Sequence, residues 1–298
     1  FCIARTKDVI GLASRNPNNS SVLELGSSIL DVEYRGAVRI LALSFDNVLA
    51  VSVGGKVDFF NVYEKELKLG KVLSLSLDDS SYVKDFRWKP KSDSFFLVLS
   101  DLGKLYHGTV QGSLKNVMDN VDAVEWSIEG DYIVVAKGDN LSILSSKFEE
   151  RSHMALSFKS WIGDPDANRT VKVDSIRWVR RDSIIVGCFQ LTEDGREENY
   201  LVQVIRSKEG IFSDASCKPI VVSFRDLFSS VIDDILPFGS GPYLLSSYLE
   251  QSELAIIANK KNTDQHIVSL GWPVGEENDE VAVIDIERDT WLPRIELQ

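Results

Sequence analysis

A six-residue pattern that recurs along the chain restricts its possible folds more than any other feature. The pattern is an apolar residue, two variable residues, an apolar residue, a charged residue and Trp, and it occurs at Val83–Trp88, Val121–Trp126 and Val173–Trp178. A turn signal and a second apolar run follow each copy, at Phe95–Leu99, Tyr132–Ala136 and Ser183–Phe189. The sequence therefore predicts a repeated unit of several strands.

Two weaker copies without Trp begin at Val38 and Ile232. The five starting residues are then separated by 45, 38, 52 and 59 residues. A period near 40 to 50 with about four strands per unit is typical of propeller blades, because one small sheet buries its faces only against neighbouring sheets. We expect an all-β protein of the β-propeller class, with about five full units and partial blades.

The Trp residues of the pattern have two possible roles. Trp88, Trp126 and Trp178 could pack between blades or form a platform for a ligand. Because aromatic side chains dominate protein cores, we interpret them as packing residues.

Composition favours one folded body. A hydrophobic fraction of 44% with 26% charged residues is ordinary for a globular protein, and all-β domains reach 298 residues. We expect residues 1–298 to form a single β-propeller domain. The chain starts at Phe1 within an apolar stretch and stops at Gln298 without a closing strand, so we expect a fragment truncated at both ends.

The charge of the chain argues against general binding to nucleic acids. The formal net charge is −12 and the isoelectric point is about 4.8, whereas contacts to phosphates need a basic footprint. We predict no direct nucleic-acid partner, and an acidic surface suits basic proteins. Since no apolar run reaches the length of a membrane helix, we predict no membrane partner either.

Residues for catalysis or metal binding do not assemble in the sequence. The three Cys and three His residues are scattered without ligand spacing, and phosphate-binding, dinucleotide and nucleophile-elbow motifs are missing. The sequence predicts neither a cofactor nor an enzyme. One alternative stays open, a small-molecule or catalytic site at the central channel of the propeller, because some propellers carry acidic clusters there.

The connections between strands contain three unusual segments. Residues 192–199 form a charged loop, residues 276–280 an acidic loop, and residues 222–231 have apolar positions at helical spacing. The Gly54-Gly55 pair predicts a tight hairpin between the apolar runs on either side. Long loops often carry the binding function of a propeller, although a charged loop can also be merely solvated.

Several segments together resemble one known family. They are Ser81–Trp88, Leu102–Gly108, Val121–Ser127, Val173–Gln190, Arg196–Val202 and Gly241–Tyr248. In their order and extent they are similar to the N-terminal β-propeller of the large cytoplasmic-side FG nucleoporin of the nuclear pore, in its plant form. No single motif is diagnostic, and the similarity spans nearly the whole chain.

The resemblance implies a seven-bladed propeller without enzymatic activity. In this family the propeller docks the DEAD-box RNA helicase of mRNA export at the cytoplasmic face of the nuclear pore complex, in the nuclear envelope, among other nucleoporins. Phe-Gly repeats that bind transport receptors lie elsewhere in the family's chain, and this sequence contains no such region.

The resemblance also suggests where the helicase binds. Family members contact it through late blades with Arg and acidic residues, and the matching segment here is Asp285–Pro293. Arg288 is the first candidate, because a guanidinium can form a bidentate pair with a carboxylate of the helicase. Asp285, Glu287 and Asp289 could face basic residues that otherwise hold RNA, so docking and RNA binding would exclude each other. A solvated charged loop is the other interpretation.

Three functional hypotheses therefore remain. The first is a docking propeller of the nuclear pore, and the second is a propeller with a small-molecule or catalytic site at its channel. The third is an assembly propeller of another complex. The first predicts salt-sensitive association with a basic protein and no turnover.

Overall fold

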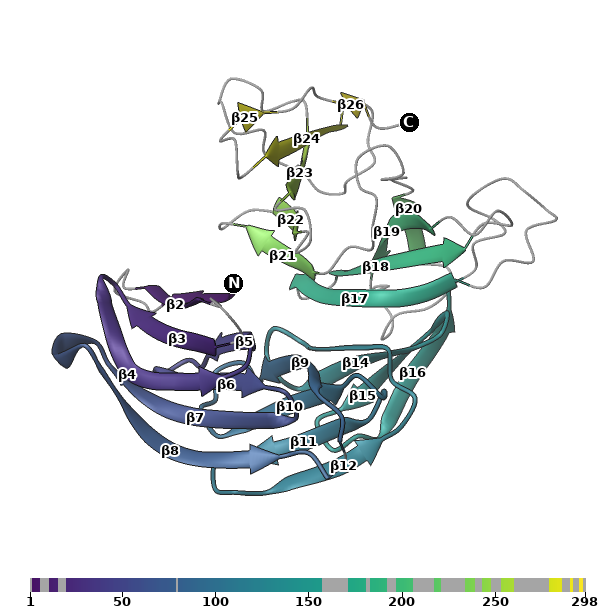
Figure 1. The fold of residues 1–298 in the computed structure, drawn as a ribbon. Helices are drawn as coiled ribbons and strands as arrows, with labels where there is room; N and C mark the ends of the chain where they lie inside the picture. The colour runs from purple at the N-terminus through teal and green to yellow at the C-terminus, as the bar shows by residue number, and fades with distance from the viewer. Residues whose placement is uncertain are drawn as a thin grey trace. The chain divides into compact units, whose positions relative to one another are not determined.

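The computed structural model describes two compact units of the chain, Phe1–Val121 and Asp122–Gln298. We describe each unit by itself. The described residues are 2–5, 11–15, 20–78, 80–156, 171–180, 183–191, 197–205, 217–220, 234–238, 243–247, 253–259, 279–285, 290–291 and 295–296. Almost all regular structure in these residues is β-strand (Figure 1).

The first unit contains three antiparallel sheets of four strands each, in sequence order. The first sheet comprises β1 (Cys2–Arg5), β2 (Gly11–Arg15), β3 (Ser20–Leu25) and β4 (Ser28–Arg35). The second comprises β5 (Val38–Leu43), β6 (Val48–Val53), β7 (Lys56–Tyr63) and β8 (Lys68–Ser76), with a 3-10 turn at Glu64–Glu66. The third comprises β9 (Val83–Trp88), β10 (Phe95–Ser100), β11 (Leu105–Thr109) and β12 (Leu114–Met118).

These strands follow the apolar runs of the sequence closely. The repeated pattern at Val83–Trp88 is β9, and the apolar run after it is β10. The Gly54-Gly55 turn joins β6 to β7 with Val53 paired to Lys56, and Gly54 has a φ of +58°. Only glycine adopts such a φ readily, so the predicted hairpin is confirmed.

Apolar side chains fill the space between neighbouring sheets of the first unit. One cluster joins the first and second sheets, and another joins the second and third. In the second cluster the ring of Trp88 meets Phe59 of β7 edge-on, with centroids 5.7 Å apart. Phe86 and Phe96 complete the group around Trp88. Trp88 therefore packs between two sheets, as its place in the repeat predicted.

The second unit continues the same arrangement. One four-stranded sheet comprises β13 (Ala123–Trp126), β14 (Tyr132–Lys137), β15 (Asn140–Ser145) and β16 (Glu150–Ala155). The next comprises β17 (Val171–Arg180), β18 (Ser183–Leu191), β19 (Glu197–Ile205) and β20 (Cys217–Ile220). The last sheet comprises β21 (Asp234–Phe238), β22 (Tyr243–Ser247), β23 (Glu253–Asn259), β24 (Asp279–Asp285), β25 (Thr290–Trp291) and β26 (Ile295–Glu296).

The core of the second unit joins its first two sheets. Trp178 on β17 belongs to the same buried cluster as Val134 on β14 and Leu141 on β15. Trp126 is buried as well. The first strands β13, β17 and β21 are neighbours in this unit, as β1, β5 and β9 are in the first. Contact through first strands is the arrangement expected of propeller blades around an axis.

The structure corrects two expectations drawn from the sequence. Residues before Val38, where the sequence predicted only a partial blade, form a complete four-stranded sheet. The turn at Gly26-Ser27 separates β3 from β4, and Gly26 has a φ of +61°. The charged loop expected over residues 192–199 is shorter, because Glu197–Asn199 already pair with β18.

Other expectations fall on residues that the structure leaves undescribed. These are the helical pattern at 222–231 and most of the acidic loop at 276–280, of which Asp279 and Glu280 already belong to β24. In the described part of the chain, five sheets of four strands and one of six account for the strands. Whether residues 1–298 form one domain stays a prediction.

Candidate docking surfaces

The residues proposed for helicase docking lie at the end of β24. Asp285 is the last residue of this strand and pairs in register with Glu253 on β23 and Thr290 on β25. Glu287, Arg288 and Asp289 lie outside the described residues, and of Asp285 only the backbone is described. Their roles therefore stay predictions.

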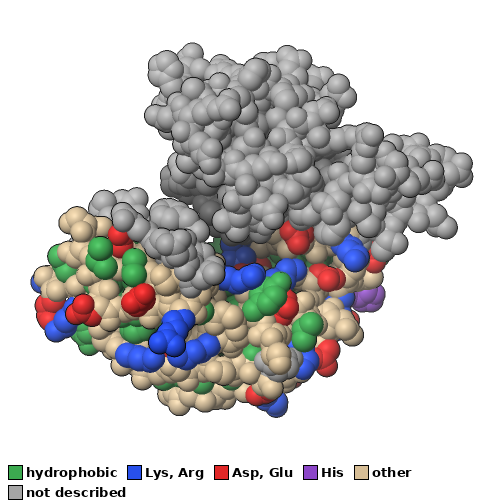
Figure 2. Space-filling view, viewed as in Figure 1, with side chains coloured by type: hydrophobic (Ala, Val, Ile, Leu, Met, Phe, Trp, Pro, Cys, Tyr) green, Lys and Arg blue, Asp and Glu red, His purple; other side chains and the backbone are tan. Residues whose placement is uncertain are grey.

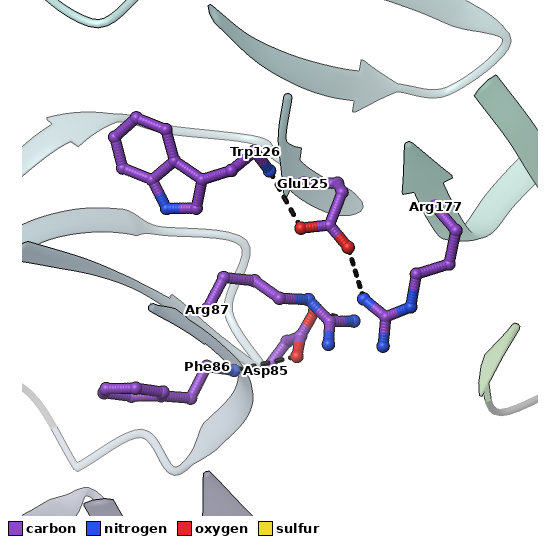
Figure 3. A network of polar contacts seen from close by, with 6 residues as sticks. All are labelled: Asp85, Phe86, Arg87, Glu125, Trp126 and Arg177. Atoms are coloured by element: carbon purple, nitrogen blue, oxygen red, sulfur yellow. Dashed lines mark hydrogen bonds and ion pairs between the residues drawn. The ribbon is translucent and has the colours of Figure 1, made fainter. Parts of the chain in front are cut away.

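The charged residue of the repeated pattern forms an ion pair on the first strand of the third sheet. Figure 3 shows Asp85 and Arg87, both on β9, with the Arg87 Nη2 atom 2.9 Å from Asp85 Oδ2. Asp85 Oδ1 also accepts a hydrogen bond of 2.8 Å from the backbone N–H of Phe86. Since side chains alternate along a strand, this pair lies on the opposite face from Phe86 and Trp88.

The second unit forms an equivalent pair between two sheets. Glu125 on β13 accepts a hydrogen bond from Arg177 Nη1 on β17 at 2.5 Å, and its other oxygen accepts from the backbone N–H of Trp126 at 2.9 Å (Figure 3). The two side chains are only 14% and 8% exposed. Glu125 and Arg177 occupy the same position in consecutive copies of the pattern, 52 residues apart.

These pairs explain why a charged residue precedes each Trp. Both carboxylates are held by a guanidinium and a backbone N–H, which is how ionised groups are stabilised when they leave water. Sequence reasoning did not identify the Glu125–Arg177 pair. Opposite charges at equivalent positions of neighbouring units were the available signal, because first strands of adjacent sheets lie side by side.

A second feature of the first unit is an exposed aromatic residue beneath a stacked arginine. The Arg39 guanidinium lies 4.1 Å from the centroid of the Tyr82 ring. Arg39 sits at a register shift between β5 and β6, where Val38 pairs with Val53 and Ile40 pairs with Ser52. Such a bulge turns a side chain away from the regular alternation. Within the described residues no carboxylate pairs with Arg39.

Reciprocal hydrogen bonds hold Tyr82 against the turn that joins β10 to β11. The backbone N–H of Tyr82 donates to Asp101 Oδ1 at 2.9 Å, and the N–H of Asp101 donates to the Tyr82 carbonyl at 3.0 Å. The next residue, Leu102, is 62% exposed. We call Arg39, Tyr82, Asp101 and Leu102 the Tyr82 cluster, a rigid group that presents a ring, a guanidinium and an aliphatic side chain to solvent.

A groove lies between two turns of the first unit. One wall is the β5–β6 turn and the other the β9–β10 turn, and the lining residues are Leu43, Ser44, Phe45, Asn47, Trp88, Lys89, Pro90 and Lys91. Its volume is about 460 Å³, within the usual range for binding pockets. Phe45 is 53% exposed on its wall. We call this feature the turn groove.

Hydrogen bonds fix the two walls of the turn groove to each other. At the base, Trp88 Nε1 donates to the Ala42 carbonyl at 2.9 Å. At the tips of the turns, the N–H of Asp46 donates to Asp93 Oδ1 at 2.6 Å. These contacts between the second and third sheets therefore fix the shape of the groove without a ligand.

One wall of the groove continues into a stack of side chains. The rings of Phe95 and His107 are parallel, with centroids 5.8 Å apart, and the Lys89 ammonium lies 5.8 Å from the Phe95 centroid. Partial burial lowers the pKa of His107, and the positive charge of Lys89 lowers it further. The neutral imidazole is thus favoured in the folded chain.

The rest of the described surface mixes hydrophobic and charged side chains. Figure 2 shows green hydrophobic groups scattered among lysines, arginines and carboxylates. No cluster of three or more His, Cys, Asp or Glu able to hold a metal occurs among the residues described. Nor does the described chain contain a helix long and apolar enough to span a membrane.

Comparisons with known structures identify the fold class. No family model matches the chain, and no curated protein matches its sequence. A chain in the structure of the COPII outer coat vertex on membranes is similar, with a TM-score of 0.63 and 14% identity; the match covers 100% of this chain and 83% of the COPII chain. The β-propeller domain of Myceliophteria thermophila Cps50 (Swd1) is similar with a TM-score of 0.56 and 10% identity. That match covers 99% of this chain and 85% of the Cps50 chain.

The N-terminal domain of Nup159 also matches, over 83% of this chain and 85% of its own, with 11% identity. Its TM-score of 0.46 is too low to support an argument about function. The other similarities, at identities of 10% and 14%, concern the fold alone. Together with the antiparallel four-stranded sheets, they assign the chain to the all-β propeller class.

Proposed function

We propose that this chain is a non-enzymatic propeller that docks other proteins. The observation that carries the proposal is the Tyr82 cluster. Tyr and Arg, together with Trp, are the residue types enriched among interface hot spots, and rigid presentation lowers the entropy lost on binding. Reciprocal hydrogen bonds between Tyr82 and Asp101 supply that rigidity.

The resemblance of the ordered sequence segments supports a more specific proposal. The chain is a component of the nuclear pore complex at the cytoplasmic side of the nuclear envelope, where it contacts other nucleoporins and docks the DEAD-box RNA helicase of mRNA export. Docking uses the segment that follows β24, with Arg288 paired to a helicase carboxylate. Asp285, Glu287 and Asp289 face basic helicase residues that otherwise hold RNA.

The alternative of a small-molecule or catalytic site at the central channel has no specific observation in its favour. Asp85 and Glu125, two carboxylates on first strands, are each held by an arginine and a backbone N–H. Carboxylates held in this way are better suited to a structural role in ion pairs than to proton transfer in catalysis.

Isothermal titration calorimetry of the 298-residue chain with the helicase tests the docking proposal. We expect micromolar or tighter binding that RNA competes away. Arg288→Glu should weaken binding at least tenfold, because it places a carboxylate against a carboxylate. Arg151→Glu is the matched control, since Arg151 is an exposed arginine of the same unit, on β16.

Two results would contradict the proposal. A folded chain that does not bind the helicase would remove helicase docking altogether. Equal affinity of the wild-type chain and the Arg288→Glu variant would remove Arg288 from the interface. Circular dichroism of each protein establishes folding before the titration.

A further inference from the structure

We propose that the Tyr82 cluster binds a segment of a partner protein through one carboxylate, which pairs with Arg39, and one aliphatic side chain, which rests on Leu102 and the Tyr82 ring. The inference rests on the proposed docking function and adds the chemistry of the partner at this surface. The cluster belongs to the first unit and is separate from Arg288, so the two surfaces can be tested independently.

Arg39 is an exposed arginine whose guanidinium lies 4.1 Å from the centroid of the Tyr82 ring. Among the described residues it takes part in no ion pair, whereas Arg87, Arg151 and Arg177 each pair with a carboxylate. An aromatic ring attracts a cation without neutralising it. Arg39 therefore keeps donors that a carboxylate of a partner can satisfy with two parallel hydrogen bonds.

Asp101, the acidic residue of the cluster, has a structural role of its own. Its Oδ1 accepts the Tyr82 N–H at 2.9 Å, and no ion pair joins it to Arg39 in the described part of the chain. The net charge of −12 belongs to the chain as a whole. Because charges more than about 8 Å apart are largely screened at physiological ionic strength, the groups next to Arg39 decide what the cluster selects.

The apolar part of the cluster is exposed and fixed in place. Leu102 is 62% exposed and Tyr82 is 38% exposed. On one side of Leu102, the Asp101 N–H donates to the Tyr82 carbonyl at 3.0 Å. On the other side, the Gly103 carbonyl accepts from the Val121 N–H at 2.9 Å. An aliphatic side chain of a partner thus meets a preformed surface, and less free energy is lost to ordering on binding.

The stacked arginine favours a protein segment over single-stranded nucleic acid. Bases bind such surfaces by stacking on aromatic rings, and Arg39 already lies over one face of the Tyr82 ring. A net charge of −12 also opposes a run of phosphates more strongly than it opposes a single carboxylate.

Selection of peptides on the immobilised 298-residue chain tests the inference. The probe is a phage library of random twelve-residue peptides, counter-selected on the Arg39→Glu variant. We expect enriched peptides in which Asp or Glu stands beside an aliphatic residue. Their affinity should fall at least tenfold in Arg39→Glu and about threefold or more in Leu102→Ala, as expected for residues at the centre of an interface. Arg39→Lys should also weaken binding, because an ammonium cannot form the bidentate pair.

Matched variants separate the cluster from general effects of charge and hydrophobicity. Arg35→Glu makes the same change of net charge at an exposed arginine of β4, and Ile29→Ala removes another side chain of that strand, which is 66% exposed. Both should bind the selected peptides as the wild-type chain does. Asp101→Asn keeps an oxygen that can accept the Tyr82 N–H and removes the negative charge, so it should bind them at least as tightly. Since all changed positions are exposed, thermal melting should show every variant folded.

Four outcomes would overturn the inference. The first is that no enriched peptide depends on Arg39, and the second is that Arg35→Glu loses affinity equally. The third is enrichment of acidic peptides on Asp101→Asn alone, which would show that Asp101 neutralises Arg39 in the native chain. The fourth is a twelve-nucleotide uridine strand that binds the wild-type chain but not Arg39→Glu, which would assign the surface to single-stranded nucleic acid.

Calorimetry with the helicase separates this inference from the docking proposal. We expect Arg39→Glu to bind the helicase with the wild-type affinity, because docking there uses the segment after β24. Helicase binding without any Arg39-dependent peptide would overturn the inference and leave the docking proposal standing. Arg39-dependent peptides without helicase binding would do the reverse.

Discussion

Single residues define the surfaces available for docking. Arg39 lies at a register shift between β5 and β6, and its guanidinium stacks on the Tyr82 ring. Lys89 contributes both to the turn groove and to the stack on Phe95. A sequence can suggest that an Arg or Lys is exposed, but a bulge of one residue decides where its charge lies. The Tyr82 cluster and the turn groove were accordingly not predicted.

The pKa of His107 predicts how stability depends on pH. In the folded chain this pKa is lowered, first by burial and then by Lys89. As the pH falls below about 6.5, the unfolded chain binds a proton at this position before the folded chain does. Stability is therefore lost between that pH and the lower pKa of the folded state. His107→Gln should make the stability curve flatter between pH 7 and 5.

Urea unfolding midpoints at half-unit pH steps measure this effect. His153→Gln is the matched control, because the imidazole of His153 is exposed on β16. Equal flattening in both variants, or none in His107→Gln, would contradict the assignment to His107.

Elements of the fold were predictable where the apolar runs are strong. The boundaries of β9 agree with the sequence expectation and those of β10 differ from it by one residue, since each run lies between clear turn residues. The first sheet was missed because β1 and β2 are short and only a Gly-Ser turn separates β3 from β4. These strands have weak local sequence preferences, and packing against the neighbouring sheet stabilises them instead.

The Glu125–Arg177 pair links two sheets of the second unit and should be strongly coupled. Glu125→Gln or Arg177→Met alone removes one partner of a buried ion pair and should cost about 3–5 kcal/mol of unfolding free energy. The double variant should cost much less than the sum, because neither charge then remains buried without its counterpart.

A double-mutant cycle from urea denaturation measures the coupling. Arg151→Met, which breaks the exposed Glu149–Arg151 pair, is the control and should cost less than about 1 kcal/mol. Additive effects of the two single substitutions would show that the pair contributes nothing of its own.

For the molecule as a whole, the repeat in the sequence was sufficient to predict the fold class. Copies spaced 38 to 59 residues apart indicated four-stranded units, and the solved structures with similar folds include a β-propeller domain. The docking site could not be derived in the same way. Arg288 and its neighbours were assigned by resemblance, and charged loops of this kind carry no periodic pattern that would fix their geometry.

Hydrogen–deuterium exchange of the 298-residue chain, alone and saturated with the helicase, tests the central claim most directly. We predict slower exchange in β24, in β25 and in residues 286–289 between them, and a return to the free rates when RNA displaces the helicase. Formation of a complex that leaves these residues unchanged, with protection confined to the unit Phe1–Val121, would contradict docking through the late strands.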